Sequence, residues 1–342
     1  MYLSFPPVRA CLFDMDGLLI DSEDKYTDVT NAILREFGRP DIPWHIKAQL
    51  QGRPGPSAGK IFRAWAQLPL TDAEFMERQV KLQKEAFQHC KPLPGVENLL
   101  HRLGKAHTFA PRGARSPSIG SASKRVHMAV ATSSHRRNYE LKTKPLQNLF
   151  SVFEEKQVVV GDDPRIGKGR GKPLPDIYLL ALKTINEAID AEGEGERQIR
   201  PEECLVFEDS VPGIEAGRRA GMRVVWVPHP GLLGIFEERE KDVLAGLTGE
   251  HKEEDLLEGS SPVANHAGQV GEVDDGWGER LETLEHFDYL KYGIDIADTR
   301  FRTESGQPST PGTTDHELEE MTAKADGKNH AKEEGVTRRG ML

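Results

Sequence analysis

Short, largely apolar runs recur along the chain, and stretches with helical periodicity separate them. The clearest runs are Val8–Phe13, His127–Ala131, Cys204–Phe207 and Val224–Val227, with a weaker one at Gln157–Val160. Short apolar runs closed by turn-forming residues are typical of buried strands in a parallel sheet. Amphipathic stretches lie between them, at Gly95–Leu103, Pro175–Ile189 and Gly213–Ala220. This alternation predicts an α/β fold built on a doubly wound parallel sheet.

Residues 22–92 interrupt this alternation. Their amphipathic stretches are Lys25–Phe37, Gly59–Ala66 and Thr71–Phe87, and they contain no convincing strand pattern. The sequence Leu93-Pro94-Gly95 then marks the return to the α/β core, since Pro and Gly open the next helix. We therefore expect an all-helical domain over residues 22–92, here called the helical insertion, between two parts of the core, 8–21 and 93–246.

Three further segments depart from the α/β pattern. Residues 107–125 are rich in Ser, Gly, Pro and Arg and exceed the usual length of a connection, so we expect a flexible surface loop. A basic loop that binds a partner is the alternative. Residues 247–294 begin as a polar, acidic stretch and are expected to form an irregular C-terminal extension. Residues 295–342 have few apolar residues to bury, which predicts a disordered tail.

The composition narrows the possible classes of function. Hydrophobic residues make up 37% of the 342 positions, which indicates a globular part diluted by polar segments. A net charge of −10 argues against a nucleic-acid partner. The three cysteines are far apart, which argues against a zinc site or a disulfide framework. Because the sequence has neither a bilayer-spanning apolar segment nor a secretory signal pattern, we expect a soluble, cytoplasmic protein without a membrane partner. We also expect a monomer.

The first candidate for chemistry is an acidic pair at the end of the first apolar run. Asp14 and Asp16 stand at a strand end, the edge where open α/β sheets bind ligands. Two carboxylates this close repel each other, and a divalent metal such as Mg²⁺ would compensate for the repulsion. Gly17 allows the tight turn that points both acids at one place. The alternative is a solvated turn with two ordinary aspartates.

A second acidic pair repeats this arrangement. Glu208 and Asp209 follow the run Cys204–Phe207, and Gly213 and a helical pattern come next. If the two strands are neighbours in a parallel sheet, their carboxyl ends bring the two acidic pairs together around one metal. A single Glu-Asp pair is often only solvated, but two such strand-end clusters in one chain are harder to explain in that way.

Two further segments have chemistry that suits a phosphate group. Thr132-Ser133-Ser134 follows the run His127–Ala131 and offers hydroxyl and main-chain donors to a phosphoryl oxygen. Lys172 precedes a proline-led helix and could neutralise a nucleophile and a transferring phosphate. As alternatives, Thr132 could cap a helix, and Lys172 could be one of many surface lysines.

The order of these motifs carries a family resemblance. DMDGLLIDSE, VATSS, GKPLPDIYL and VFEDSVPGIEAGRRAGM resemble the four motifs of the haloacid dehalogenase-like (HAD) hydrolases in order and approximate spacing. The helical insertion is similar to the small helical cap of the phosphoglucomutase and phosphatase branch of that superfamily. The stretch Ala131–Phe153, followed by Val160-Gly161-Asp162-Asp163-Pro164, resembles the pseudouridine-5'-phosphatase-like group. The resemblance implies the same α/β core and a phosphatase acting on a small phosphate monoester of a nucleoside, sugar or polyol.

The resemblance also implies catalytic roles. Asp14 matches the nucleophile that forms an aspartyl-phosphate. Asp16 matches the general acid and base, and its presence favours phosphoryl transfer over dehalogenation. Thr132 matches the phosphate-binding hydroxyl, with Ser133 beside it as a further substrate-binding candidate, and Lys172 matches the charge-neutralising lysine.

The implied cofactor is Mg²⁺. Its side-chain ligands would be Asp14, Glu208 and Asp209, and the main-chain carbonyl of Asp16 would add a further oxygen. The same catalytic set also serves sugar phosphomutases, so the motifs leave this second activity open. A catalytically inactive HAD-fold binding protein is a third alternative, against which the complete set of core residues argues.

Substrate selection in this family lies largely with the cap. Gly52 and Arg53 are candidates because they stand in a polar loop between helices of the insertion, where Arg53 could reach a phosphate or hydroxyl of the substrate. The alternative is an exposed structural arginine.

Overall fold

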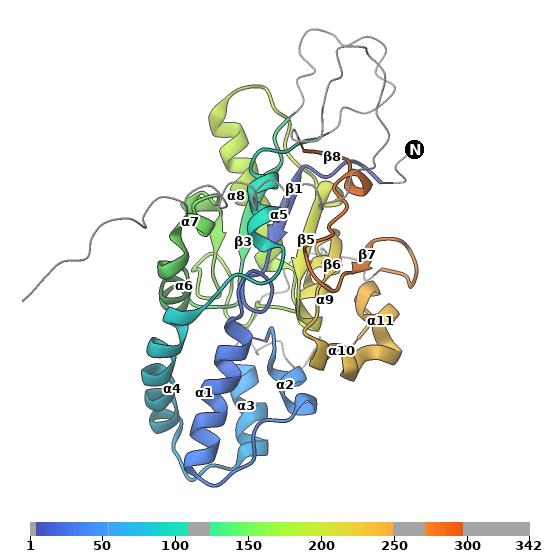
Figure 1. The fold of residues 1–342 in the computed structure, drawn as a ribbon. Coiled ribbons are helices and arrows are strands. Elements are labelled where there is room, and N and C mark those ends of the chain that lie inside the picture. The colour runs from blue at the N-terminus through green and yellow to red at the C-terminus, as the bar shows by residue number, and fades with distance from the viewer. Residues whose placement is uncertain (1–4, 54, 109–123, 249–270, 297–342) are drawn as a thin grey trace, which may run out of the picture. The chain divides into compact units, whose positions relative to one another are not determined.

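The computed structural model describes residues 5–53, 55–108, 124–248 and 271–296. Within these residues, six strands form a parallel sheet in the order β4-β3-β1-β5-β6-β7 (Figure 1). The strands are β1 (Ala10–Phe13), β3 (His127–Ala131), β4 (Val158–Val159), β5 (Cys204–Glu208), β6 (Arg223–Trp226) and β7 (Gly278–Arg280). The first five coincide with the apolar runs of the sequence, because those runs are buried on both faces of the sheet.

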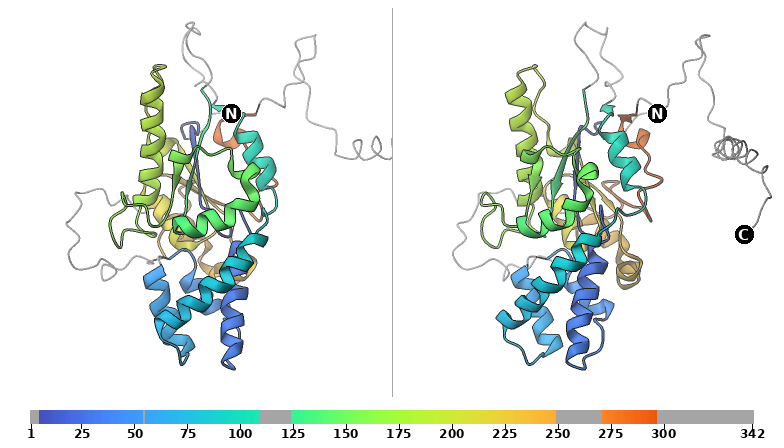
Figure 2. Two further views of the ribbon diagram at one scale, coloured as in Figure 1. Left: turned by 90° about the vertical axis from the view of Figure 1, so that its left-hand side faces the viewer. Right: turned by 60° about the vertical axis from the view of Figure 1, so that its left-hand side comes forward.

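Helices cover both faces of the sheet (Figure 2). On one face lie α5 (Val96–Leu103), α6 (Arg136–Thr143) and α7 (Gln147–Phe150), and on the other α8 (Asp176–Glu192), α9 (Val211–Arg219), α10 (Pro230–Phe236) and α11 (Glu240–Ala245). Side chains alternate along β1, so Cys11 and Phe13 join the hydrophobic cluster of the first face and Ala10 and Leu12 that of the second. The predicted doubly wound sheet is confirmed.

The helical insertion contains α1 (Ser22–Glu36), α2 (Trp44–Leu50), α3 (Gly55–Ala66) and α4 (Asp72–Ala86) among its described residues. Thr71 starts α4 with a capping box that it forms with Glu74. Leu34, Phe62 and Ala66 form a small hydrophobic cluster separate from those of the sheet. Across the described part of the chain, no helix is both long enough and apolar enough to pass through a bilayer.

The C-terminal extension is more ordered than the sequence predicts. We expected residues 247–294 to be irregular, but β7 pairs with β6 at the edge of the sheet, and β8 (Ile294–Asp295) pairs antiparallel with β2 (His107–Thr108). Outside these short strands and the helical turn Leu290–Tyr292, residues 271–294 form turns and loops, and buried apolar side chains that follow neither helical nor strand periodicity pack them against the core. These side chains are Leu284, Phe287, Tyr292 and Ile294.

The remaining expectations fall largely outside the described residues. Within the segment 107–125, the described ends form a bridge from His107 to Arg125, so that β3 starts in register after it. Residues 109–123 of the expected surface loop and 297–342 of the expected tail lie outside the described residues. The helical insertion and the sheet belong to one compact unit, so their division into two domains stays a prediction.

The packing of the C-terminal extension can be tested at Phe287. Its ring contacts those of Phe207, Tyr289 and Tyr292, and the residue is 5% exposed. We expect Phe287→Ala to lower the free energy of unfolding by about 3–5 kcal/mol, since it leaves a cavity against the sheet. Leu290→Ala is the matched control, because Leu290 is 64% exposed and should change the stability by less than about 0.5 kcal/mol. Equal effects of the two substitutions in chemical denaturation would contradict this packing.

Candidate active site

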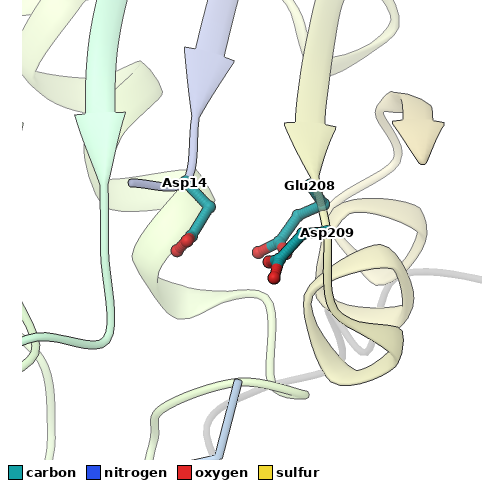
Figure 3. A group of neighbouring side chains, drawn as sticks. All are labelled: Asp14, Glu208 and Asp209. Carbon is teal, nitrogen blue, oxygen red and sulfur yellow. The ribbon is translucent and has the colours of Figure 1, made fainter. Parts of the chain in front are cut away.

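Two acidic clusters meet at the carboxyl edge of the sheet. β1 and β5 are parallel neighbours with Phe13 opposite Phe207, so Asp14 and Glu208 follow at the same edge. Asp14, Glu208 and Asp209 each offer a carboxylate oxygen within 4.8 Å of the others, and all three residues are buried. Their side chains point toward a common space (Figure 3). The structure therefore brings together the two strand-end clusters that the sequence predicts.

Lys172 joins the two clusters. Its Nζ donates to Asp14 Oδ1 (2.5 Å), Glu208 Oε1 (2.6 Å) and the main-chain oxygen of Ala131 (3.0 Å). These contacts use all three donors of the ammonium group. The side chain is 1% exposed, so water competes little with these charge-assisted bonds. Lys172 is therefore not one of the surface lysines that the sequence left as an alternative.

The Glu208 carboxylate is fixed by four donors. Besides Lys172, its Oε1 accepts a hydrogen bond from Tyr178 OH (2.6 Å). Its Oε2 accepts from the main-chain N (3.1 Å) and Oγ (2.9 Å) of Ser210. The Ser210 hydroxyl in turn accepts from Gly213 N and so caps α9. The start of α9 thereby sets the orientation of Glu208.

Gly17 allows the turn after β1, which contains Asp14 and Asp16, to lie close to Asp209. Its φ of +78° lies in the left-handed region that favours glycine. A Cβ at this position would lie 2.2 Å from Asp209 Oδ2 and 2.8 Å from Glu23 Cγ. Any side chain here would push the two acidic clusters apart.

The crowded carboxylates change one another's acidity. Burial, together with the charges of Glu208 and Asp16, raises the pKa of Asp14 to about 7, although Lys172 acts in the opposite direction. Burial and the charge of Glu208 also raise the pKa of Asp209 well above its ordinary value. Burial disfavours the charged form of Lys172, but the attraction of the Asp14 and Glu208 carboxylates outweighs the effect of burial. The pKa of Lys172 is therefore raised. Three acids thus face one ammonium group, which leaves the site short of positive charge.

This set of donors fits a divalent cation. Asp14, Glu208 and Asp209 supply the hard oxygen ligands that Mg²⁺ prefers, and their oxygens are close enough to share one ion. A cation would also favour the ionised forms of Asp14 and Asp209, whose pKa values burial and the neighbouring charges raise. Within the described residues, the Asp16 carboxylate is not part of this group.

Asp16 faces a separate set of donors. Its Oδ1 accepts from Ser22 Oγ (2.5 Å) and from Lys142 Nζ, and its Oδ2 accepts from Ser134 Oγ (2.6 Å) and Thr132 Oγ1 (3.3 Å). Burial alone would raise the pKa of Asp16, but the Lys142 ammonium and the hydroxyls of Ser134 and Ser22 hold it below its ordinary value. Asp16 is therefore held as an ionised acceptor.

Thr132 and Ser133 lie beside the acids in different surroundings. Thr132 is fully buried, and its Oγ1 accepts from the main-chain N of Ser134 (3.1 Å) while donating to Asp16. Ser133 is half-buried, and its Oγ donates to the main-chain oxygen of Gly52 (3.4 Å) in the helical insertion. The structure thus places both hydroxyls at the site edge, with Ser133 on the side of the insertion.

The loop after α2 brings the helical insertion onto the site. Gly52 has a φ of +73°, and a Cβ there would lie 2.3 Å from Ser210 Oγ, so glycine permits close contact with the acidic edge. The neighbouring Gln51 is 4% exposed, and its Nε2 donates to Asp209 Oδ2. Arg53 Nε donates to the main-chain oxygen of Gln49 (2.8 Å), the end of the preceding helix. Gly52 therefore contacts the site directly, and Arg53 stands at its margin.

Sequence reasoning missed two residues of the site, Lys142 and Tyr178. It expected Ser134 to bind phosphate, whereas the Ser134 hydroxyl donates to Asp16. Lys142 stands in a strongly polar helix and reads as a surface lysine, although it follows the buried Tyr139 by three positions and so shares its face. Tyr178 is two residues inside α8, on the face that packs against the sheet. Gln51 belongs to the same polar loop as Gly52 and Arg53, but nothing in the sequence indicates its contact with Asp209.

Comparisons with known proteins identify the family of this chain. Residues 8–221 match the family model described as haloacid dehalogenase-like hydrolase. A probable pseudouridine-5'-phosphatase of Saccharomyces cerevisiae is 42% identical over 84% of this chain and 98% of its own length. (DL)-glycerol-3-phosphatase 2 of Arabidopsis thaliana is 31% identical over 71% of this chain and 89% of its own.

Among solved structures, a putative beta-phosphoglucomutase from Thermotoga maritima is 27% identical, with a TM-score of 0.45 over 66% of this chain and 91% of that one. The family match covers both acidic clusters, Thr132 and Lys172, and the relatives extend over most of the described residues. The chain belongs to the haloacid dehalogenase-like hydrolases.

Proposed function

We propose that this chain is a Mg²⁺-dependent phosphatase that hydrolyses a small phosphate monoester through an aspartyl-phosphate on Asp14. The observation that carries the proposal is the Asp14 carboxylate, held by Lys172 and grouped with Glu208 and Asp209 at the carboxyl edge of the sheet. The relatives named as phosphatases of pseudouridine-5'-phosphate and glycerol-3-phosphate support a nucleoside, sugar or polyol phosphate as substrate.

Asp14 is the nucleophile of the first step. Its carboxylate attacks phosphorus, the bond to the ester oxygen breaks, and Asp16 in its protonated form gives that oxygen a proton. Lys172 offsets charge at Asp14, and the hydroxyls of Thr132 and Ser133 hold the phosphoryl oxygens.

The second step needs the ionised form of Asp16, which the lowered pKa of its carboxyl favours. Its carboxylate takes a proton from a water molecule as that water attacks phosphorus, which releases inorganic phosphate and restores Asp14.

The proposed ligands of Mg²⁺ are the carboxylates of Asp14, Glu208 and Asp209 and the main-chain carbonyl of Asp16. Bound there, the ion would supply positive charge to the nucleophile and to the phosphoryl oxygens. Gly52 and Arg53 are the proposed substrate-selecting residues, because the loop that contains them lies against Ser210 and Ser133. Cytoplasmic localisation and a monomeric state stay predictions.

Substitution of the nucleophile tests the proposal. We expect Asp14→Asn to lower turnover of phosphorylated nucleosides, sugars and polyols by at least about 1,000-fold, since an amide cannot form the phosphoenzyme. Asp28→Asn, an exposed residue of α1, should leave turnover unchanged. Phosphate release and the melting temperature should be measured for both variants. Substantial turnover by a folded Asp14→Asn variant would refute the assignment.

Analysis of the products separates the phosphatase from the phosphomutase. A phosphatase releases one inorganic phosphate for each ester consumed, because water takes up the phosphoryl group. An isomerised sugar phosphate that accumulates without free phosphate, detected by ³¹P NMR, would replace the phosphatase assignment with that of a mutase.

Binding of Mg²⁺ can be measured without substrate. A ligand at about 100 times its Kd stabilises the folded state by about 2.7 kcal/mol, so Mg²⁺ should raise the melting temperature of the wild type. Asp209→Asn should lose this increase, yet without Mg²⁺ it should be at least as stable as the wild type because one repelling charge is gone. NaCl at equal ionic strength is the control. An unchanged Mg²⁺ effect in Asp209→Asn would remove this residue from the ligand set.

A further inference from the structure

Lys142 is a second buried lysine at the site, with no role in the function proposed above. It lies in α6 and its side chain is 0% exposed. Its Nζ donates to Asp16 Oδ1, Ser134 Oγ (2.7 Å) and Tyr26 OH (3.3 Å). These contacts use all three donors of the ammonium group. The charge of Lys142 is therefore directed at Asp16 and at two hydroxyl groups next to it.

Burial of this charge does not by itself indicate a contribution to stability. Desolvation of an ion pair can outweigh its Coulomb energy, so such a pair is weak evidence for a stabilising role. The same segment also contains Lys144, which is exposed, so a lysine in this part of the chain can readily lie at the surface. The position of Lys142 therefore needs another explanation, and the geometry of Asp16 supplies one.

The four donors to Asp16 come from three parts of the fold. Ser22 begins α1, Thr132 and Ser134 follow β3, and Lys142 belongs to α6. Lys142 is the charged donor among them, and it also bonds to Ser134, which donates to the other carboxylate oxygen (2.6 Å). Lys142 thus acts on both oxygens, directly on Oδ1 and through Ser134 on Oδ2, and so restricts rotation of the carboxylate.

We propose that Lys142 is a positioning residue that fixes the Asp16 carboxylate for proton transfer. The inference rests on the proposed phosphatase function, in which Asp16 gives a proton to the leaving oxygen. Each lysine then pairs with a different carboxylate: Lys172 with the nucleophile Asp14, and Lys142 with the proton-transfer residue Asp16. In this proposal Lys142 acts through Asp16, since its three hydrogen bonds go to Asp16, Ser134 and Tyr26.

The dependence of the rate on the leaving group tests this role. An alkyl phosphate releases an alkoxide that needs a proton, whereas p-nitrophenyl phosphate releases a stable phenolate. In Lys142→Met, we expect single-turnover cleavage of the best alkyl phosphate to fall by about 100-fold or more, the usual contribution of general acid catalysis. The p-nitrophenol burst should fall by less than about 10-fold, and KM should change little.

A double-substitution cycle with Asp16 makes the test specific. If Lys142 acts through Asp16, adding Lys142→Met to Asp16→Asn should cause no further loss of alkyl phosphate cleavage. Lys144→Met, the exposed neighbour, is the matched control and should behave as the wild type. Ser134→Ala keeps the ion pair between Lys142 and Asp16 but removes the hydrogen bond to Asp16 Oδ2. It should therefore also slow cleavage of the alkyl phosphate more than that of p-nitrophenyl phosphate, though by a smaller factor. This variant provides the test if Lys142→Met does not fold.

Two results would overturn the proposal. One is an equal loss with both leaving groups, and the other is a further loss in the Asp16→Asn background, because a purely structural lysine would produce either. Failure of the proposed function is distinguishable from these, since the wild type would then cleave neither ester.

Discussion

The pairing of β1 with β5 is the constraint on which the site depends. It sets Phe13 opposite Phe207, and their rings stack with centroids 4.7 Å apart on one face of the sheet. The Phe153 ring packs edge-on against Phe13 from the adjoining connection. A slip of one residue would turn these rings to the opposite face and carry Asp14 away from Glu208. Hydrophobic packing in the core therefore fixes the register that brings the acids together at the edge.

The same edge concentrates buried charge, which the fold balances locally. Asp14 and Glu208 share Lys172, and Asp16 pairs with Lys142. The carboxylate of Asp209 accepts only the neutral amide of Gln51 among the described contacts. Burial is the main cause of the raised pKa values of Asp14 and Asp209, and the neighbouring carboxylates add to it. The position proposed for Mg²⁺ lies next to Asp209, which forms no ion pair with a lysine in the described part of the chain. The cation would therefore neutralise the acid that the two lysines leave unpaired.

Sequence reasoning succeeded where local signals determine the structure. The apolar runs identified the strands, and the acids at their ends predicted the edge where the carboxylates meet, because strand ends in a parallel sheet converge on one side. Sequence reasoning failed where the surroundings of a residue depend on contacts with residues that are distant in the sequence. Lys142 is indistinguishable from a surface lysine until Asp16, far away in the chain, is placed against it. Strand β7 likewise forms because it pairs with the outer edge of β6, since its residues Gly278–Arg280 have low strand propensity.

The helical insertion contributes atoms to both sides of the site. From α1, Ser22 bonds to Asp16 and Tyr26 receives a hydrogen bond from Lys142. From the loop after α2, Gln51 bonds to Asp209, on the side of the proposed cation. A movement of the insertion would therefore disturb the proton-transfer side and the cation side together. The segment proposed to select the substrate is thus hydrogen-bonded to the groups proposed to carry out the chemistry. Contacts between the substrate and this segment would therefore alter the positions of those groups directly.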